Sequence, residues 1–176
     1  MISFIVPTIG KESLATTLAS IQTWPGDEIL LVSDHVQVSD PRVRYIQRER
    51  GNDWGHAERN YAMPFAKNRY IAHIDDDDVY TPNARAFMDD AIRTTPGRPI
   101  IFRMQFPCGI TLWRDKQVRC GNLGTPCFLI PNEPAKMGYW GSFVGGDCSF
   151  LETSKWQAED YVWREEVIAL LGHDIG

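Results

Sequence analysis

Four consecutive carboxylates, Asp75 to Asp78, follow an apolar run at residues 71–74 that has the composition of a buried strand. Such closely spaced like charges are costly unless water or a cation offsets their repulsion. A buried strand would deliver them at its carboxyl end, where open α/β sheets bind ligands. Hard oxygen ligands with no nearby thiolate suit Mg²⁺ or Mn²⁺, ions that bridge protein carboxylates to the phosphates of a nucleotide. A solvated acidic turn that caps the next helix explains the four residues equally well, so this stretch alone leaves both interpretations open.

The elements that must position these acids alternate along the first half of the chain. Apolar or alternating runs predict strands at residues 2–6, 28–33, 41–46 and 69–74. Helices are predicted after Ser13, which we expect to act as an N-terminal cap, and at residues 56–67 and 83–93. Asp34 follows the second strand as the four acids follow the fourth, so two strands deliver carboxylates in the same direction. Strands that alternate with helices predict a mostly parallel sheet covered on both faces.

The second half of the chain changes character. Strands are predicted at residues 99–104, 110–113 and 128–130, and we expect them to pair antiparallel. A short helix at residues 147–153 and a last strand at residues 160–163 follow, while the tail at residues 165–171 fits either helix or strand. The sequence therefore predicts an α/β protein whose second half is antiparallel.

Composition limits the class of protein. The 176 residues suffice for one domain with a sizeable core, and 43% apolar and 23% charged residues are ordinary for a soluble globular protein. A formal charge of -5 gives no general attraction to nucleic acid or anionic membranes. No stretch approaches the roughly 20 apolar residues that span a bilayer, and no export signal follows Met1, so we expect a cytoplasmic protein. The four cysteines form no Cys-x-x-Cys pair, and reduced thiols are expected.

Four segments, taken in order, resemble the successive motifs of family-2 glycosyltransferases with the GT-A fold. They lie at residues 4–8, 28–34, 55–60 and 74–78. The resemblance implies a Rossmann-like mixed sheet, with central parallel strands flanked by helices and an antiparallel second half. It further implies a single domain over residues 1–176, in which residues 1–95 bind a nucleotide sugar and residues 96–176 bind the acceptor.

The same resemblance implies roles at the base end of a nucleotide-sugar donor. The backbone of Pro7 and Thr8 and the side chain of Asp34 would face the nucleobase. Asp34 can accept a hydrogen bond from a ring N–H, which favours uracil. Arg59 resembles the basic residue that meets the base or the diphosphate, and a planar, permanently charged guanidinium suits either role.

For the acidic run, the resemblance implies a different role for each of the four aspartates. Asp75 would accept from the ribose hydroxyls, and Asp77 would hold a Mn²⁺ or Mg²⁺ ion on the diphosphate. Asp76 belongs to the same donor-binding group but would point to the opposite side of the pleat, and Asp78 would point toward the sugar. The resemblance also offers His173 as a metal ligand, with a solvated residue near the end of the chain as the alternative.

Two acids compete for the role of general base toward the acceptor. Asp147 follows Gly145 and Gly146 in a segment that resembles the acidic motif opening the acceptor-side helix, and Asp160 lies in a segment that is also similar. We expect Asp147 to be the base, because residues 161–163 are better explained as a closing strand. The alternative, non-catalytic interpretation is that Asp147 only caps the N-terminus of the helix.

The resemblance implies a metal-dependent, inverting hexosyltransferase that moves a sugar from a UDP-linked donor to a glycan or a small molecule. A nucleotidyltransferase that makes nucleotide sugars is one alternative, although such enzymes carry a Gly-rich, basic phosphate loop and residues 7–11 hold one glycine and one lysine. A non-catalytic module that binds sugar nucleotides is the other alternative.

Overall fold

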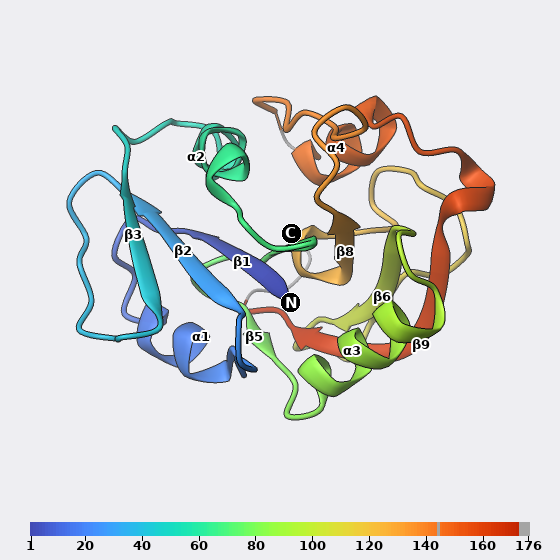
Figure 1. Cartoon of the computed structure of the whole chain (residues 1–176), viewed down its shortest axis with the longest axis horizontal. Coiled ribbons are helices and arrows are strands. Elements are labelled where there is room, and N and C mark those ends of the chain that lie inside the picture. Colours follow the sequence, from blue (N-terminus) through green and yellow to red (C-terminus); the bar gives the residue numbers. More distant parts are fainter. Residues whose placement is uncertain (144, 173–176) are drawn as a thin grey trace.

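The structure is a computed structural model that describes residues 1–143 and 145–172, and one sheet of nine strands runs through these residues (Figure 1). The strands are β1 (Ile2–Pro7), β2 (Glu28–Ser33), β3 (Val43–Gln47), β4 (Tyr70–His73), β5 (Val79–Tyr80), β6 (Ile100–Gln105), β7 (Thr111–Leu112), β8 (Phe128–Pro131) and β9 (Val162–Leu170). The helices are α1 (Leu14–Ser20), α2 (His56–Ala62), α3 (Ala84–Thr94) and α4 (Gly146–Thr153), with 3-10 turns η1 (Met63–Phe65), η2 (Thr125–Cys127) and η3 (Ala158–Asp160). None of the helices in the described ranges is long and apolar enough to cross a membrane.

The strand order is β3-β2-β1-β4-β8-β6-β9-β5, with β7 paired to β6. The four strands that were predicted in the first half, β3, β2, β1 and β4, are parallel, as expected. The predicted antiparallel pairing holds for β8 against β4 and for β6 against β8 and β7. In contrast, β9 lies parallel to β6 and antiparallel to the short β5. The result is the mixed sheet that the sequence predicts.

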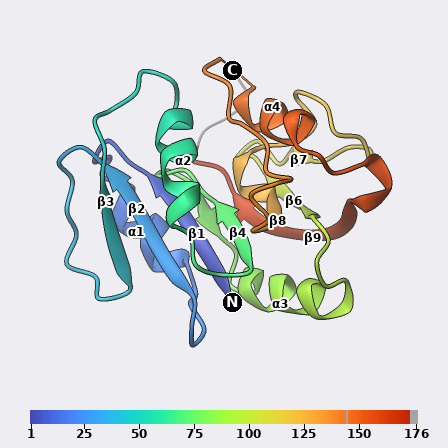
Figure 2. The same ribbon diagram turned by 45° about the horizontal axis from the view of Figure 1, so that its top comes forward.

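Helices cover both faces of this sheet, as predicted. In Figures 1 and 2, α1 and α3 lie on one side of the strands while α2 and α4 lie on the other. Alternate residues of β1 explain the arrangement, because successive side chains of a strand point to opposite faces. Phe4 and Val6 pack in the same cluster as Leu18 of α1, whereas Ile5 packs in a second cluster with Ala62 of α2.

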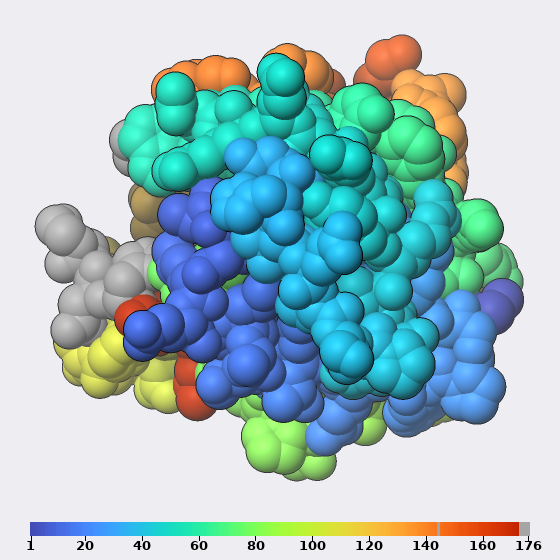
Figure 3. Space-filling model, turned by 90° about the vertical axis from the view of Figure 1, so that its left-hand side faces the viewer, coloured from blue at the N-terminus to red at the C-terminus, as the bar shows by residue number. Residues whose placement is uncertain are grey.

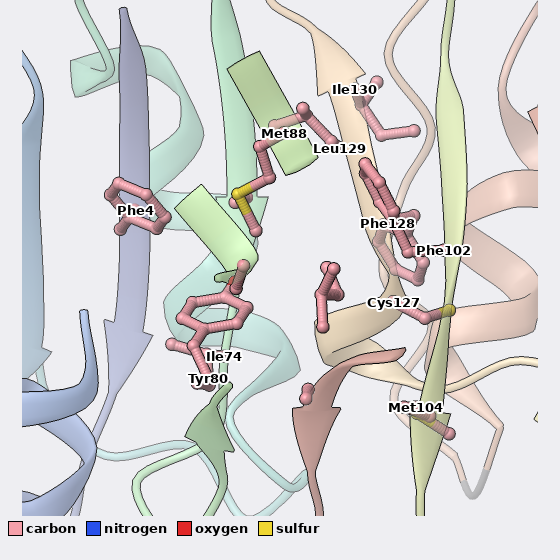
Figure 4. Packing of buried hydrophobic residues seen from close by; sticks show 14 of the residues in the cluster. Phe4, Ile74, Tyr80, Met88, Phe102, Met104, Cys127, Phe128, Leu129 and Ile130 are labelled. Carbon is pink, nitrogen blue, oxygen red and sulfur yellow. The ribbon is translucent and has the colours of Figure 1, made fainter. Parts of the chain in front are cut away.

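The strand that ends in the acidic run lies in the middle of the sheet. All four residues of β4 are buried, because β1 and β8 flank the strand and helices cover it. Beside it, Phe128, Leu129 and Ile130 of β8 pack into the larger cluster together with Phe102 of β6 and Met88 of α3 (Figure 4). A rigid, fully packed strand therefore carries the four carboxylates to the edge of the sheet.

Two local predictions differ from the structure. Ser13 precedes α1, but its hydroxyl does not cap the helix and instead donates to the backbone carbonyl of Asp76 at 2.8 Å. The predicted helix at residues 56–67 ends at Ala62, because Pro64 lies in the 3-10 turn that follows. The tail that fitted either helix or strand is a strand, the second part of β9.

The expectation of reduced thiols is wrong for two of the four cysteines. Cys120 and Cys148 form a disulfide that joins the loop after β7 to α4. The two residues are 28 positions apart, and the fold brings them together by laying that loop against the first turn of the helix. Sequence spacing gives no sign of such a contact, since the pairing depends on tertiary structure.

Candidate active site

A cleft of about 650 Å³ opens where β1, β2 and β4 end. These strands are parallel neighbours, so their carboxyl ends meet at one edge of the sheet. Figure 3 views this side of the molecule, with the loop after β1 in dark blue below the turquoise loop that precedes α2. The cleft brings together six residues for which the sequence predicts a site: Pro7, Thr8, Asp34, Asp75, Asp76 and Asp77.

A second cleft of about 440 Å³ adjoins the first. Asp147, Asp78 and His56 line it, together with apolar residues from β6, β7 and the loops around them. Asp75 and Trp54 line both clefts and therefore form their common wall. The predicted donor-side and acceptor-side acids thus lie on the two sides of one boundary.

The buried side chain of Arg59 holds both residues of this boundary in place. Its guanidinium donates to the carboxylate of Asp75 through Nη2 and to the backbone carbonyl of Trp54 through Nη1, the latter at 2.9 Å. The guanidinium lies 4.7 Å from the centre of the Trp140 ring, and the side chain is only 1% exposed. Arg59 lines neither cleft, so in this structure it positions Asp75 and the Trp54 backbone instead of facing a ligand.

Asp76 and Asp77 have different surroundings although they are adjacent. Asp76 is buried and accepts hydrogen bonds from the Thr8 hydroxyl at 2.7 Å and from the Ile9 amide at 3.3 Å. Asp77 is partly exposed, and the Lys11 ammonium lies 2.7 Å from its Oδ2 and 3.3 Å from Oδ1 of Asp76. Asp76 therefore fixes the loop after β1, while Asp77 is free to face the cleft.

Asp78 is fully buried at the far end of the run. Burial raises the pKa of its carboxyl to about 8, and the negative charge of Asp75 acts in the same direction. Its Oδ1 accepts from the Gly172 amide at 3.1 Å, and its Oδ2 has no hydrogen-bond partner among the described residues. Burial and the charge of Asp75 therefore favour the protonated form of Asp78, and a neutral Asp78 lowers the repulsion within the acidic run.

Asp147 lies in the first turn of α4 at the second cleft. Burial raises the pKa of its carboxyl, and its Oδ1 accepts from the Cys148 amide at 2.7 Å. Gly146 allows the close approach of α4 to the site, because a Cβ at this position would lie 2.2 Å from Cε1 of His56. By contrast, Asp160 accepts from the Gln157 amide in η3 and lines neither cleft.

Several residues at the clefts have no role predicted from the sequence, among them Lys11, Trp54 and His56. His56 is buried, stacks on Trp140 with ring centres 5.7 Å apart, and has a pKa lowered by burial. His56 belongs to the motif at residues 55–60 and Trp54 directly precedes it, and this proximity was the available signal. His173, the further metal ligand suggested by the resemblance, lies outside the described residues.

The acidic run can offer only a few carboxylate ligand atoms to a divalent ion. Among the described residues, the acids do not converge into a group of three ligand atoms, and the one such group contains the disulfide-bonded Cys120 and Cys148. Asp77 offers a single accessible carboxylate that already holds a cation, the ammonium of Lys11. One or two carboxylates suit Mg²⁺ or Mn²⁺, because phosphates and water complete the coordination. The oxygen-only donor set therefore fits these ions.

Residues 3–96 match the family described as glycosyl transferase family 2. The chain belongs to this family. It is 33% identical over 97 residues to a protein of Escherichia coli (strain K12) named as a colanic acid biosynthesis glycosyl transferase, WcaA, in an alignment that covers 47% of this chain and 34% of that protein. The family match thus rests on the half of the chain that carries the first cleft.

Solved structures show the same fold. TarS of S. aureus is similar with a TM-score of 0.71 at 14% identity, covering 97% of this chain and 36% of TarS. TarS 1-349 in complex with UDP-GlcNAc also gives 0.71 at 14% identity, covering 99% of this chain and 59% of that one. The chain therefore spans between about a third and three fifths of the length of these relatives. The likeness confirms the predicted GT-A fold class.

Proposed function

We propose that this chain transfers a sugar from a UDP-linked donor to a glycan or small-molecule acceptor, with Mg²⁺ or Mn²⁺, and inverts the anomeric carbon. The observation that carries the proposal is the pair of adjoining clefts that share Asp75 and Trp54. Acids at strand ends line the first cleft and a partly buried acid, Asp147, lines the second. Two adjoining clefts with acids in both would allow a donor in the first cleft and an acceptor in the second to come into contact at Asp75 and Trp54.

The first cleft suits a nucleoside diphosphate. Pro7, Thr8 and Asp34 line it, and there Asp34 could accept from a uracil N–H while Asp75 could accept from the ribose hydroxyls. The structures of TarS 1-349 in complex with UDP and with UDP-GlcNAc support uridine as the base. Family membership favours sugar transfer over the formation of nucleotide sugars.

Asp77 would hold the divalent ion, since Asp75, the other partly exposed carboxylate at the strand end, is already paired with Arg59. When bound, Mg²⁺ or Mn²⁺ supplies electrostatic stabilisation for the negative charge that develops on the departing diphosphate. Lys11 would then be released from Asp77 and could donate to a phosphate oxygen. Arg59 would keep Asp75 in place throughout, because the guanidinium is buried beneath it.

Asp147 would take the proton from the acceptor hydroxyl. A carboxylate whose pKa is raised by burial is a stronger base than an exposed one, which favours proton abstraction near neutral pH. Its position in the second cleft puts it across the common wall from the donor cleft. Attack from that side, opposite the leaving group, inverts the anomeric carbon.

Thermal unfolding with a panel of nucleoside diphosphates and their sugars, in Mn²⁺ or in EDTA, tests this proposal. We expect UDP and UDP-sugars to raise the melting temperature in Mn²⁺ and to lose most of the effect in EDTA, because ligands that prefer the native state stabilise it. The Asp77→Asn variant should lose the Mn²⁺-dependent part, while Asp89→Asn, on the remote helix α3, should keep it. Equal shifts with and without Mn²⁺ would refute the metal-dependent part of the proposal.

Turnover separates the enzyme from a non-catalytic binding module. Wild-type chain incubated with a UDP-sugar and a mixture of acceptor sugars should release UDP in excess of the UDP formed without acceptor. A chain that binds the donor but releases no UDP with any acceptor would favour the binding module.

A further inference from the structure

Trp54 has a backbone conformation that tryptophan rarely adopts. Its φ is +57°, and it is the one residue other than glycine with positive φ in the described part of the chain. Such a conformation costs free energy for a bulky side chain and persists where the surroundings impose it, often at functional sites. The indole is also 65% exposed, so burial of the ring does not compensate for the strain.

Contacts on both sides impose this conformation. The Trp54 carbonyl accepts from the buried Arg59, and Gly55 follows with φ of +79° at a place where a Cβ would come within 2.9 Å of the Pro7 ring. The buried carboxylate of Asp53 accepts from the Ala57 amide at the start of α2. The loop is therefore built around the backbone of Trp54 and leaves its side chain outside.

The indole stands at the boundary between the two clefts. Trp54 shares this boundary with Asp75, whose carboxylate is fixed by Arg59. On one side lies the cleft with Asp77, and on the other lie His56, 6.1 Å away between ring centres, and Asp147. Trp54 and Asp75 are the two residues that line both clefts, so a group that lies between the clefts lies next to them.

We propose that the face of Trp54 is the platform on which the pyranose ring of the donor stacks while the sugar lies between the clefts. A pyranose exposes C–H groups on one face, and an exposed indole offers a flat, apolar partner of matching size, with its own N–H left for water or a hydroxyl. This inference rests on the proposed function and adds to it the residue that recognises the sugar. The base end of the donor lies elsewhere, near Asp34, so Trp54 should contribute to the sugar alone.

Calorimetry with UDP, UDP-glucose, UDP-galactose and UDP-GlcNAc in Mn²⁺ tests the assignment. The measured quantity is the ratio between the Kd of UDP and the Kd of the tightest UDP-sugar. In Trp54→Gly this ratio should fall by about tenfold, because the variant loses the stacking contact with the sugar while Asp34, Asp75 and Asp77, to which we assign the contacts with UDP and its metal ion, stay in place. Trp54→Phe should keep most of the ratio, because it retains an aromatic face.

Two further variants guard the interpretation. Glycine accepts positive φ without strain, so Trp54→Gly should melt no lower than the wild type. Trp54→Asn, another residue that tolerates this conformation, should show the same loss if the glycine variant folds poorly. Tyr139→Ala removes a comparably exposed aromatic ring that lines neither cleft, and it should leave the ratio unchanged.

The outcomes separate this inference from the proposed function. A wild-type chain that binds neither UDP nor any UDP-sugar would refute both. A wild-type chain that binds UDP-sugars no more tightly than UDP, or Trp54→Gly and Trp54→Asn variants that keep the wild-type ratio, would refute the platform alone. A change confined to the KM of the acceptor would likewise overturn the assignment to the donor sugar.

Discussion

Asp147 and Asp77 lie on opposite sides of the wall between the clefts, and their roles should separate in the same way. Asp147→Asn should keep the affinity for a UDP-sugar and lose sugar transfer by about 100-fold, because the amide occupies the same space but takes no proton. Initial rates and calorimetry on the same preparation check this. Asp160→Asn, at the remote turn η3, is the control; if it loses transfer while Asp147→Asn does not, the base is assigned wrongly.

His73 should make stability depend on pH. It is buried among Trp140, Phe128 and Phe150, and burial lowers its pKa well below the usual value. Below pH about 6.5 the unfolded chain binds a proton at this residue and the folded chain does not, so the free energy of unfolding should fall as pH decreases, by up to about 1.4 kcal/mol per pH unit.

Urea unfolding at pH 7 and pH 5 measures that slope for His73. The His73→Phe variant should show a smaller loss between the two pH values, whatever its absolute stability. An identical pH dependence in the wild type and in His73→Phe would show that His73 carries a proton when folded.

At the level of single residues, the sequence predicted the site correctly where acidic side chains directly follow apolar strands. Asp34, Asp75 and Asp77 were predicted together because each follows an apolar run, and all three line one cleft. Arg59 was assigned to the ligand, yet Trp140 covers it from 81 positions further along the chain, a contact that no local pattern reveals. The strained φ of Trp54 depends in part on that same buried guanidinium.

Elements with strong local patterns were predicted, and elements that depend on distant partners were not. The strands β1, β2 and β4 are continuous apolar runs, which buried parallel strands require. The two-residue β5 was not predicted and pairs with β9 some ninety positions later. Of β9 itself, the beginning falls within the strand predicted at residues 160–163, while the pattern at residues 165–171 did not distinguish strand from helix. Long-range pairing, not propensity, decides these elements.

The disulfide between Cys120 and Cys148 ties the loop after β7 to the helix that carries Asp147. Reduction with dithiothreitol should lower the free energy of unfolding by about 3 kcal/mol, because the unfolded chain regains the entropy of a 28-residue separation. Denaturant unfolding with and without reductant measures the change. The double variant Cys120→Ser/Cys148→Ser should lack this response to reductant, and an equal response in both proteins would contradict the assignment.

The two halves of the molecule are interleaved in the sheet. Antiparallel β8 covers the edge of β4, and β9 pairs with β5, so strands from residues 96–176 complete the half that carries the family motifs. A fragment of residues 1–95 would expose the edge of β4 and much of the larger apolar cluster.

This fragment should therefore fail to fold cooperatively on its own. We expect the fragment of residues 1–95 to show no sigmoidal thermal transition by circular dichroism and rapid cleavage by protease, whereas the full chain shows a single transition. A fragment that melts cooperatively and binds UDP would contradict this prediction and would make the first half an independent unit.

The amide of Gly172 donates to Asp78, and a Cβ at Gly172 would come within 2.0 Å of the Asp77 carbonyl oxygen. The opposite end of the chain lies at the other end of β1, where the Ile2 amide donates to Asp27. Any side chain at position 172 would consequently push away the backbone of Asp77 and, with it, the carboxylate that we assign to the cation. The geometry of the cation site thus depends on a residue nearly one hundred positions away that has no functional group of its own.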